Sequence, residues 1–297
     1  MREFGACTPT VFSFSEYNQG EEAMSIRNIL LAHSGSAGFE SSLTHALKIA
    51  SRHEAWLTFI YGGSASFSDR ILVLTDDLRE RLVAVRNTKI NNIRARFEEA
   101  VAIAGLSDRT RFLMPEDVGK LSVSQVARGF DFVITGYHSD LPADESRATS
   151  PDLIALQSGR PVLVVPDGFK AEHLAGHALV AWDGKRAATR AVNDAMTILE
   201  EKPRKVTLIT VGDRLQESPE GAGILDHLER HGVQASHVRK PLTRSGVAEI
   251  ISNTADEIGA KLIVMGAYEH SKFSQDLFGG VTHDVVRSAR VPVFMSH

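Results

Sequence analysis

The sequence has one cysteine, Cys7, among 297 residues, so no disulfide bond can form within the chain. Such a chain is typical of a reducing compartment, and we expect the protein to be cytoplasmic. No apolar run approaches the roughly 18 residues that a membrane-spanning helix needs, so we expect no membrane partner. Lys and Arg form no long run and the net charge is −4, which argues against a nucleic-acid partner.

The first residues also lack periodic hydrophobicity, and they lack the basic start and apolar core of a secretory signal. After them, Met24 precedes the apolar stretch SIRNILLAH, which begins like a domain. We expect residues 1–24 to be a disordered leader or an over-extended start. A short regulatory arm is the alternative.

Apolar strand-like runs alternate with helical stretches in the rest of the chain, which predicts an α/β fold with parallel sheets. The length suits two domains, and we place them at residues 25–167 and 177–297, with a linker over 167–177. The predicted strands cover 26–33, 55–62, 110–115, 130–136, 160–166, 177–184, 205–212, 235–241, 261–266 and 291–296. The predicted helices cover 39–52, 77–104, 187–200, 221–231 and 247–258, and a last helix opens at Gly279 and Gly280.

The second domain repeats the order of the first. Gly35 and Gly184 follow the first strands and are 149 residues apart. Gly136 and Gly266 end the fourth strands, 130 apart, and Pro161 and Pro292 open the fifth strands, 131 apart. The shorter spacing later in the repeat fits a longer second helix in the first domain. We interpret the chain as one duplicated unit.

A ligand of such a sheet is expected beyond the carboxyl ends of the strands, where the strand order reverses. In the second domain, Asp183 could accept hydrogen bonds there from a ribose or a base. Gly266 would let the backbone approach a ligand closely. Gly280 would open a helix whose free N–H groups favour an anion, with Ser271 and Thr282 as hydroxyl donors.

The duplicated five-strand unit resembles the universal stress protein family in its tandem form, over about residues 25–297. Members that bind ATP carry Gly, two residues, Gly, nine residues, Gly, then Ser or Thr. Here Gly266 and Gly279 match the first and third glycines, whereas Glu269 replaces the second and Gly280 the hydroxyl residue. The spacing is specific only together with Asp183, which matches the acidic residue of the family.

The resemblance implies two tandem Rossmann-like domains of the adenine nucleotide alpha hydrolase type, each a five-stranded parallel sheet flanked by helices. It also implies that strands 160–166 and 291–296 pair in an internal pseudo-dimer; a homodimer of the chain and an unidentified protein partner stay open. The implied cofactor is ATP or AMP, bound only by the second domain. The implied site residues are Asp183, Gly184, Val211, Met265, Gly266, His270, Ser271, Gly279, Gly280, Val281 and Thr282.

Glu269 opposes this implication, because a carboxylate about 4 Å from a phosphate costs on the order of 1–4 kcal/mol. His270 and Lys272 could offset the charge, or Glu269 could point to solvent. The loop then holds ATP or AMP, or another small ligand, or it is a remnant with weak or no nucleotide binding.

In the first domain Ser34 replaces the aspartate, and Thr149 and Ser150 replace the Gly–Ser/Thr pair, so we expect no nucleotide there. We expect the turn 34–36 to cap the following helix.

Other patterns are less informative. His227 and His231 are four residues apart, a spacing that suits a metal pair, but no third ligand is evident, and we interpret them as a solvated helix face with no metal. We expect Trp182 to pack against the core, and Lys185 to belong to a charged first turn unless it contacts an anion.

The sequence contains no recognisable arrangement of catalytic residues. We therefore expect a non-catalytic stress-response protein; the alternatives are a nucleotide-independent interaction module or, less favoured, an ATP-hydrolysing or adenylating enzyme.

Overall fold

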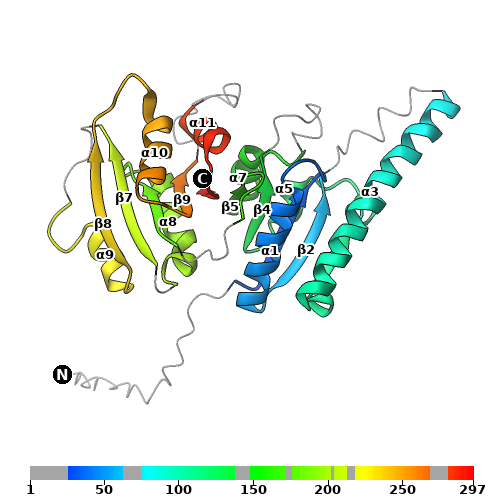
Figure 1. The fold of residues 1–297 in the computed structure, drawn as a ribbon, viewed down its shortest axis with the longest axis horizontal. Coiled ribbons are helices and arrows are strands. Elements are labelled where there is room, and N and C mark those ends of the chain that lie inside the picture. Colours follow the sequence, from blue (N-terminus) through cyan, green and yellow to red (C-terminus); the bar gives the residue numbers. More distant parts are fainter. Residues whose placement is uncertain are drawn as a thin grey trace, which may run out of the picture.

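Helices cover both faces of a single long, twisted sheet in the computed structural model of the chain (Figure 1). The structure describes residues 26–62, 75–137, 148–170, 176–201, 204–212, 218–267 and 280–297. Among the helices in those ranges, none combines the length and the apolar character that crossing a membrane requires. The expected leader, and the middle of the expected linker, lie outside the described residues.

The two halves have the same order of elements. The first half contains β1 (Asn28–His33), α1 (Phe39–His53), β2 (Trp56–Tyr61), α3 (Asp76–Ala104), β3 (Thr110–Leu113), α4 (Pro115–Val118), α5 (Val123–Ala127), β4 (Phe132–Gly136), α7 (Pro151–Ser158) and β5 (Val162–Val165). The second half contains β6 (Ala178–Ala181), α8 (Arg186–Leu199), β7 (Lys205–Val211), α9 (Ile224–Arg230), β8 (Gln234–Lys240), α10 (Gly246–Glu257), β9 (Leu262–Gly266), α11 (Val281–Ser288) and β10 (Val293–Ser296). All ten predicted strands are present, with ends within three residues of the prediction.

Three short helices of the first half, α4, α5 and α7, are not predicted from the apolar pattern. A local signal for α5 exists, since Ser122 and Gln125 form a reciprocal capping box. Pro151 at the first position of α7 is another such signal. The prediction that the turn 34–36 caps α1 is wrong. The N-cap is Gly38, whose φ of 81° suits glycine and which has no side chain to accept a hydrogen bond.

The sheet has the strand order β3-β2-β1-β4-β5-β10-β9-β6-β7-β8. Neighbouring strands within each half are parallel, and β1 lies beside β4 as β6 lies beside β9. The expected pairing of the two last strands is observed, because β5 and β10 are antiparallel neighbours. The two five-stranded sheets are therefore continuous, and among the strands that the structure describes the two at the edges are β3 and β8.

A hydrophobic core fills each face of the sheet. On one face, α1, α3, α8 and α9 pack over side chains that include Phe39, Phe59 and Phe294. Phe59 stacks on Phe112 with ring centroids 4.6 Å apart. On the other face, α5, α7, α10 and α11 pack over strand side chains that include Ile263. The inner strands are thus buried on both sides, which explains why they are continuous apolar runs, whereas the outer strands β3 and β8 are partly exposed.

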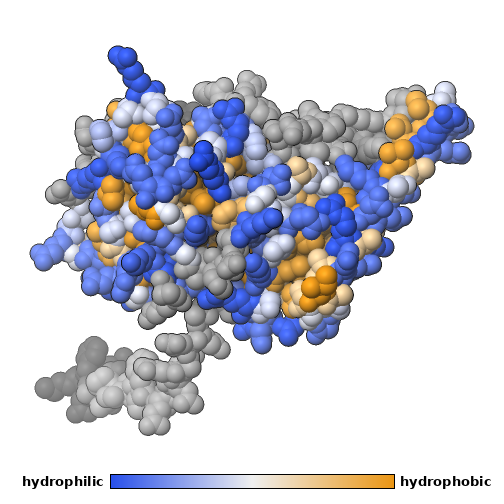
Figure 2. All heavy atoms as spheres, viewed as in Figure 1, coloured by the Kyte–Doolittle hydropathy of each residue, from blue (hydrophilic) through white to orange (hydrophobic). Residues whose placement is uncertain are grey.

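The extra chain of the first half lies in α3, which has 29 residues where its counterpart α9 has 7. Only the second half of α3 packs on the sheet, through Ile90, Ile93 and Phe97. Its first turns project beyond the sheet, and their exposed apolar side chains form the orange patch at that end of the helix in Figure 2. The exposed large apolar residues there are Leu78, Leu82 and Val85.

Phe294 tests the junction of the halves. It is buried on β10, opposite Leu163 of β5, with its ring 6.3 Å from that of Phe132. We expect Phe294→Ala to lower the free energy of unfolding by about 3–5 kcal/mol, because it removes a buried ring and leaves a cavity. Urea denaturation measures this, and Ile103→Ala, at an 82% exposed position, should change it by less than about 0.5 kcal/mol. Equal effects of the two variants would contradict the packing described.

His45 predicts a dependence of stability on pH. Its Nδ1 donates to the Ser41 carbonyl oxygen at 2.7 Å, and its buried Nε2 has no partner among the described residues. Burial lowers the pKa of His45 below its ordinary 6.5 in the folded state. The unfolded chain therefore binds the proton more readily, and stability falls as the pH drops below about 6.5. We expect His45→Gln to flatten the fall measured by urea denaturation between pH 8 and pH 5; an unchanged slope would show that His45 has no such role.

Candidate functional site

The carboxyl ends of three neighbouring strands of the second half bring several predicted site residues to one edge of the sheet. Ala181 of β6 lies opposite Ile209 of β7 and Met265 of β9. Asp183 and Val211 each lie two residues beyond this row, and Gly266 lies one beyond it. The helix α11 connects this edge to the start of β10, so Gly280 also lies at this edge. Parallel sheets of this order bind ligands at such a place.

Asp183 is half-exposed and is held by its own loop. The backbone N–H of Lys185 donates to Asp183 Oδ1 at 3.0 Å, and Lys185 Nζ lies 3.8 Å from Oδ2. Gly184 between them has a φ of 72°, a left-handed conformation that favours glycine. The loop thus orients a carboxylate that can still accept hydrogen bonds from hydroxyl groups, with a cationic side chain beside it. Lys185 is the N-cap residue of α8 rather than part of its first turn.

Behind this loop is a polar chain that sequence reasoning missed. Thr210 Oγ1 donates to the Trp182 carbonyl oxygen at 3.0 Å and lies 2.9 Å from His237 Nε2. Burial, and secondarily the charge of Arg239, lowers the pKa of His237. The Trp182 side chain packs against the core, as predicted. Together these contacts fix the end of β6 just before Asp183. The signal in the sequence is Thr210 near the end of the mostly apolar strand β7.

Gly266 has a structural reason to be glycine. A Cβ at this position would lie 2.5 Å from the backbone nitrogen of Ala188 and 2.6 Å from the carbonyl carbon of Ala187, in the first turn of α8. The absence of a side chain therefore allows the end of β9 to pack against α8. Two other predicted site residues contribute mainly to packing: Met265 is buried and Val211 is partly buried against the core.

The start of α11 also lies at this edge. Gly280 is its N-cap, with a φ of 126°, and no atom of the described residues lies within 4 Å of the place a Cβ would take. Val281 is 40% exposed, whereas the Thr282 side chain is buried. The backbone N–H groups at the start of a helix, together with its dipole, favour an anion at this position. His270, Ser271 and Gly279, like Glu269, lie outside the described residues.

The corresponding edge of the first half is filled by its own side chains. His33 and Ser34, the counterparts of Trp182 and Asp183, are completely buried. His33 Nδ1 accepts the backbone N–H of Gly35 at 3.0 Å, and Ser34 Oγ bonds to Ser36 Oγ at 3.3 Å. No carboxylate faces this edge from position 34.

Two larger side chains complete the filling. Thr149, just before the N-cap Ser150 of α7, is completely buried, and its Cγ2 takes the place that a Cβ would have on Gly62. Ile93 of α3 likewise lies against Gly35, where it would overlap a Cβ. The Thr135 hydroxyl donates to the Thr149 carbonyl oxygen at 3.3 Å and fixes this arrangement. The side chains of Thr149 and Ile93 thus fill this strand edge of the first half.

Other features lie away from this edge. A hollow of about 380 Å³ runs between α10 and α11, and another of about 740 Å³ lies near α9 and the starts of β7 and β8; neither is lined by a predicted site residue. His227 and His231 have ring centroids 4.7 Å apart, and His231 Nδ1 lies 2.7 Å from Glu200 Oε1. His231 is exposed, as the predicted solvated face requires, whereas His227 is partly buried, with its Nε2 inaccessible. In the described ranges no three metal-binding side chains gather.

Comparison with known proteins agrees with the resemblance found in the sequence. The model of the universal stress protein family matches residues 175–297. A universal stress protein from Archaeoglobus fulgidus DSM 4304 is 14% identical and aligns with 91% of this chain and 96% of its own, with a TM-score of 0.67. A protein of unknown function from Pseudomonas aeruginosa PAO1 is 15% identical over 91% of this chain and 92% of its own, with a TM-score of 0.53. No curated protein matches the chain. The fold of both halves is thereby confirmed, and the family resemblance is confirmed for residues 175–297.

Gly266 yields a prediction about this edge. We expect Gly266→Ala to lower the free energy of unfolding by about 1–3 kcal/mol, because the new methyl group meets backbone atoms of α8 that cannot move aside easily. Gly129→Ala is the matched control, since its nearest atom would be a carbonyl oxygen at an ordinary 3.8 Å. Urea denaturation compares the two variants. A Gly266→Ala protein as stable as the control would show that the strand–helix contact is looser than described.

Proposed function

Because residues 175–297 form a universal stress protein domain, we propose that the chain is a non-catalytic stress-response protein whose second half binds ATP or AMP. The observation that carries the proposal is the contrast between the two strand edges. The second half has a half-exposed, oriented carboxylate at Asp183 and a glycine, Gly280, at the N-cap of α11, whereas Ser34 and Thr149 are buried at the strand edge of the first half.

The described residues suit the parts of a nucleotide in turn. Asp183 can accept hydrogen bonds from the two ribose hydroxyls, since its carboxylate is half-exposed at the end of β6. The first turn of α11 offers backbone N–H groups to a phosphate, and Lys185 adds a positive charge near Asp183. Val211 provides an apolar surface at the neighbouring strand end. In this proposal the first half contributes the other five strands of the sheet and binds no second nucleotide.

We further propose that the protein acts in the cytoplasm, with its two halves as an internal pseudo-dimer. An unidentified protein partner would bind the nucleotide-bound form in preference to the free form. A nucleotide-independent interaction module is the second candidate, because Glu269 places a negative charge in the phosphate loop. An adenylating enzyme is less favoured: it would normally carry a Ser-Gly-Gly-x-Asp-Ser type loop after the first strand, and HSGSAG at residues 33–38 lacks the aspartate.

Calorimetric titration of the full chain with ATP and with AMP tests the proposal. We expect micromolar binding of one nucleotide per chain, and we expect Asp183→Ala to weaken it roughly 10- to 100-fold, the loss that removing a charged hydrogen-bond acceptor produces. Asp108→Ala, which removes a 78% exposed carboxylate of the first half, controls for charge and should bind like the unaltered protein.

Three other outcomes would contradict the proposal or a part of it. No binding heat at millimolar nucleotide would make the loop a remnant and favour the interaction module. Equal loss in both variants would remove Asp183 from the site. Release of pyrophosphate during incubation with ATP would instead favour the adenylating enzyme.

A further inference from the structure

The two halves are related by an approximate two-fold axis that passes through the junction of the sheet. Leu163 of β5 and Phe294 of β10 are counterparts, 131 residues apart, and they lie directly opposite each other in the antiparallel pair. The pairs on either side exchange places, as a two-fold axis requires: Val164 lies opposite Val293, and Val162 lies opposite Met295.

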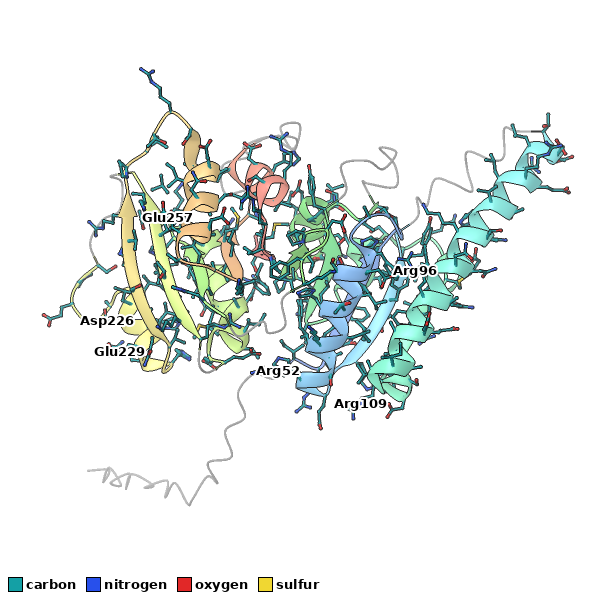
Figure 3. The ribbon with its side chains drawn as sticks, in the orientation of Figure 1. Arg52, Arg96, Arg109, Asp226, Glu229 and Glu257 are labelled. Atoms are coloured by element: carbon teal, nitrogen blue, oxygen red, sulfur yellow. The ribbon has the colours of Figure 1, made fainter. Side chains whose placement is uncertain are left out.

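On one face of the sheet, the axis brings together the ends of α1 and α8. These helices correspond with an offset of 149 residues, since the buried residues Leu43 and Ala50 of α1 match the buried Val192 and Leu199 of α8. With this offset Arg52 is the counterpart of Glu201. The two form an ion pair, with Arg52 Nε 3.3 Å from Glu201 Oε1. Figure 3 shows Arg52 at the end of α1, on the side of the second half.

On the other face, the axis brings together α7 and α11. Their buried residues correspond with an offset of 131, as Ile154 and Ala155 match Val285 and Val286. Asp152 is then the counterpart of His283. His283 Nδ1 lies 3.7 Å from Asp152 Oδ2, and both side chains are largely buried. The His283 ring also contacts the ring of Tyr137, with centroids 5.9 Å apart.

A residue that lies next to a two-fold axis meets its own counterpart. In a pair of identical halves, these positions would place Arg against Arg or Glu against Glu, and Asp against Asp or His against His. We propose that the opposite side chains at these two positions make the junction heterotypic: the β5 edge of a first half accepts the β10 edge of a second half and rejects a second copy of itself. Juxtaposed like charges suppress the wrong partner in the same way at other interfaces.

The surroundings strengthen this discrimination on the α1 side. Glu201 is only 10% exposed and lies 3.2 Å from His53 Nε2 of the first half and 3.6 Å from Arg204 Nη2 of its own half. Arg204 is held in place because it donates to the carbonyl oxygens of Ile198 and Gly176. A cation at position 201 would face these groups with no anion between them. The inference does not depend on nucleotide binding, so either can fail without the other.

Hydrogen exchange of the full chain tests the Asp152–His283 pair. His283→Asp places two carboxylates at the axis, and we expect the amides of β5 and β10 that join the halves to exchange about tenfold faster or more. The amides of β1 and β7, inside each half, should be unchanged. Asp152→His combined with His283→Asp restores opposite side chains and should return the exchange to within about twofold of the unaltered protein.

Arg52→Glu tests the other face in the same way, and its effect should add to that of His283→Asp. Asp284→Asn is the matched control, because Asp284 pairs with Arg287 of its own helix and lies off the axis. Unchanged exchange in both His283→Asp and Arg52→Glu would overturn the proposal. A swapped variant that exchanges as fast as His283→Asp would also overturn it. The position of each residue, rather than the pairing of a carboxylate with an imidazole, would then matter.

Discussion

The antiparallel pairing of β5 with β10 is the contact on which the rest of the architecture depends. Without it, each half would expose the edge of a buried apolar strand, with unpaired backbone groups ready to join another chain. With it, Leu163 and Phe294 meet in one core, and of the described strands β3 and β8 keep a free edge. These outer strands are partly exposed, and β8 carries charged side chains such as Arg239 and Lys240, which discourage further strand addition.

The strands and their order of occurrence could be predicted because their cause is local. Gly136 and Gly266 do end the fourth strands, and Pro161 and Pro292 do precede the fifth, so the duplication was visible in spacing alone. The short helices of the first half were missed because their apolar faces are too brief to show a period; caps and prolines define them instead. The candidate site could be located at a strand edge, but its loop over 268–279 remains a prediction.

Contacts between residues far apart in the chain could not be predicted from the sequence. Gly266 was expected to let a ligand approach the backbone closely. In the structure, its missing side chain lets the first turn of α8 approach instead. The filling of the first half by Thr149 and Ile93 requires knowing which side chains the fold brings together. The same holds for Arg52 and Glu201, which are unremarkable surface-type residues in the sequence. The two halves thus share one order of strands. Apart from the longer α3, the volume and charge of a few side chains distinguish their strand edges and their sides of the junction.

The connection between Val165 and Ala178 has a consequence for how the molecule behaves in dilute solution. Two separate chains that met edge to edge would dissociate as their concentration fell. Here the partner edge is tethered by a short segment, which holds it at an effective concentration on the order of millimolar. The ten-stranded sheet is therefore formed by a single chain at any abundance, and a cell containing only a few copies still contains the complete assembly.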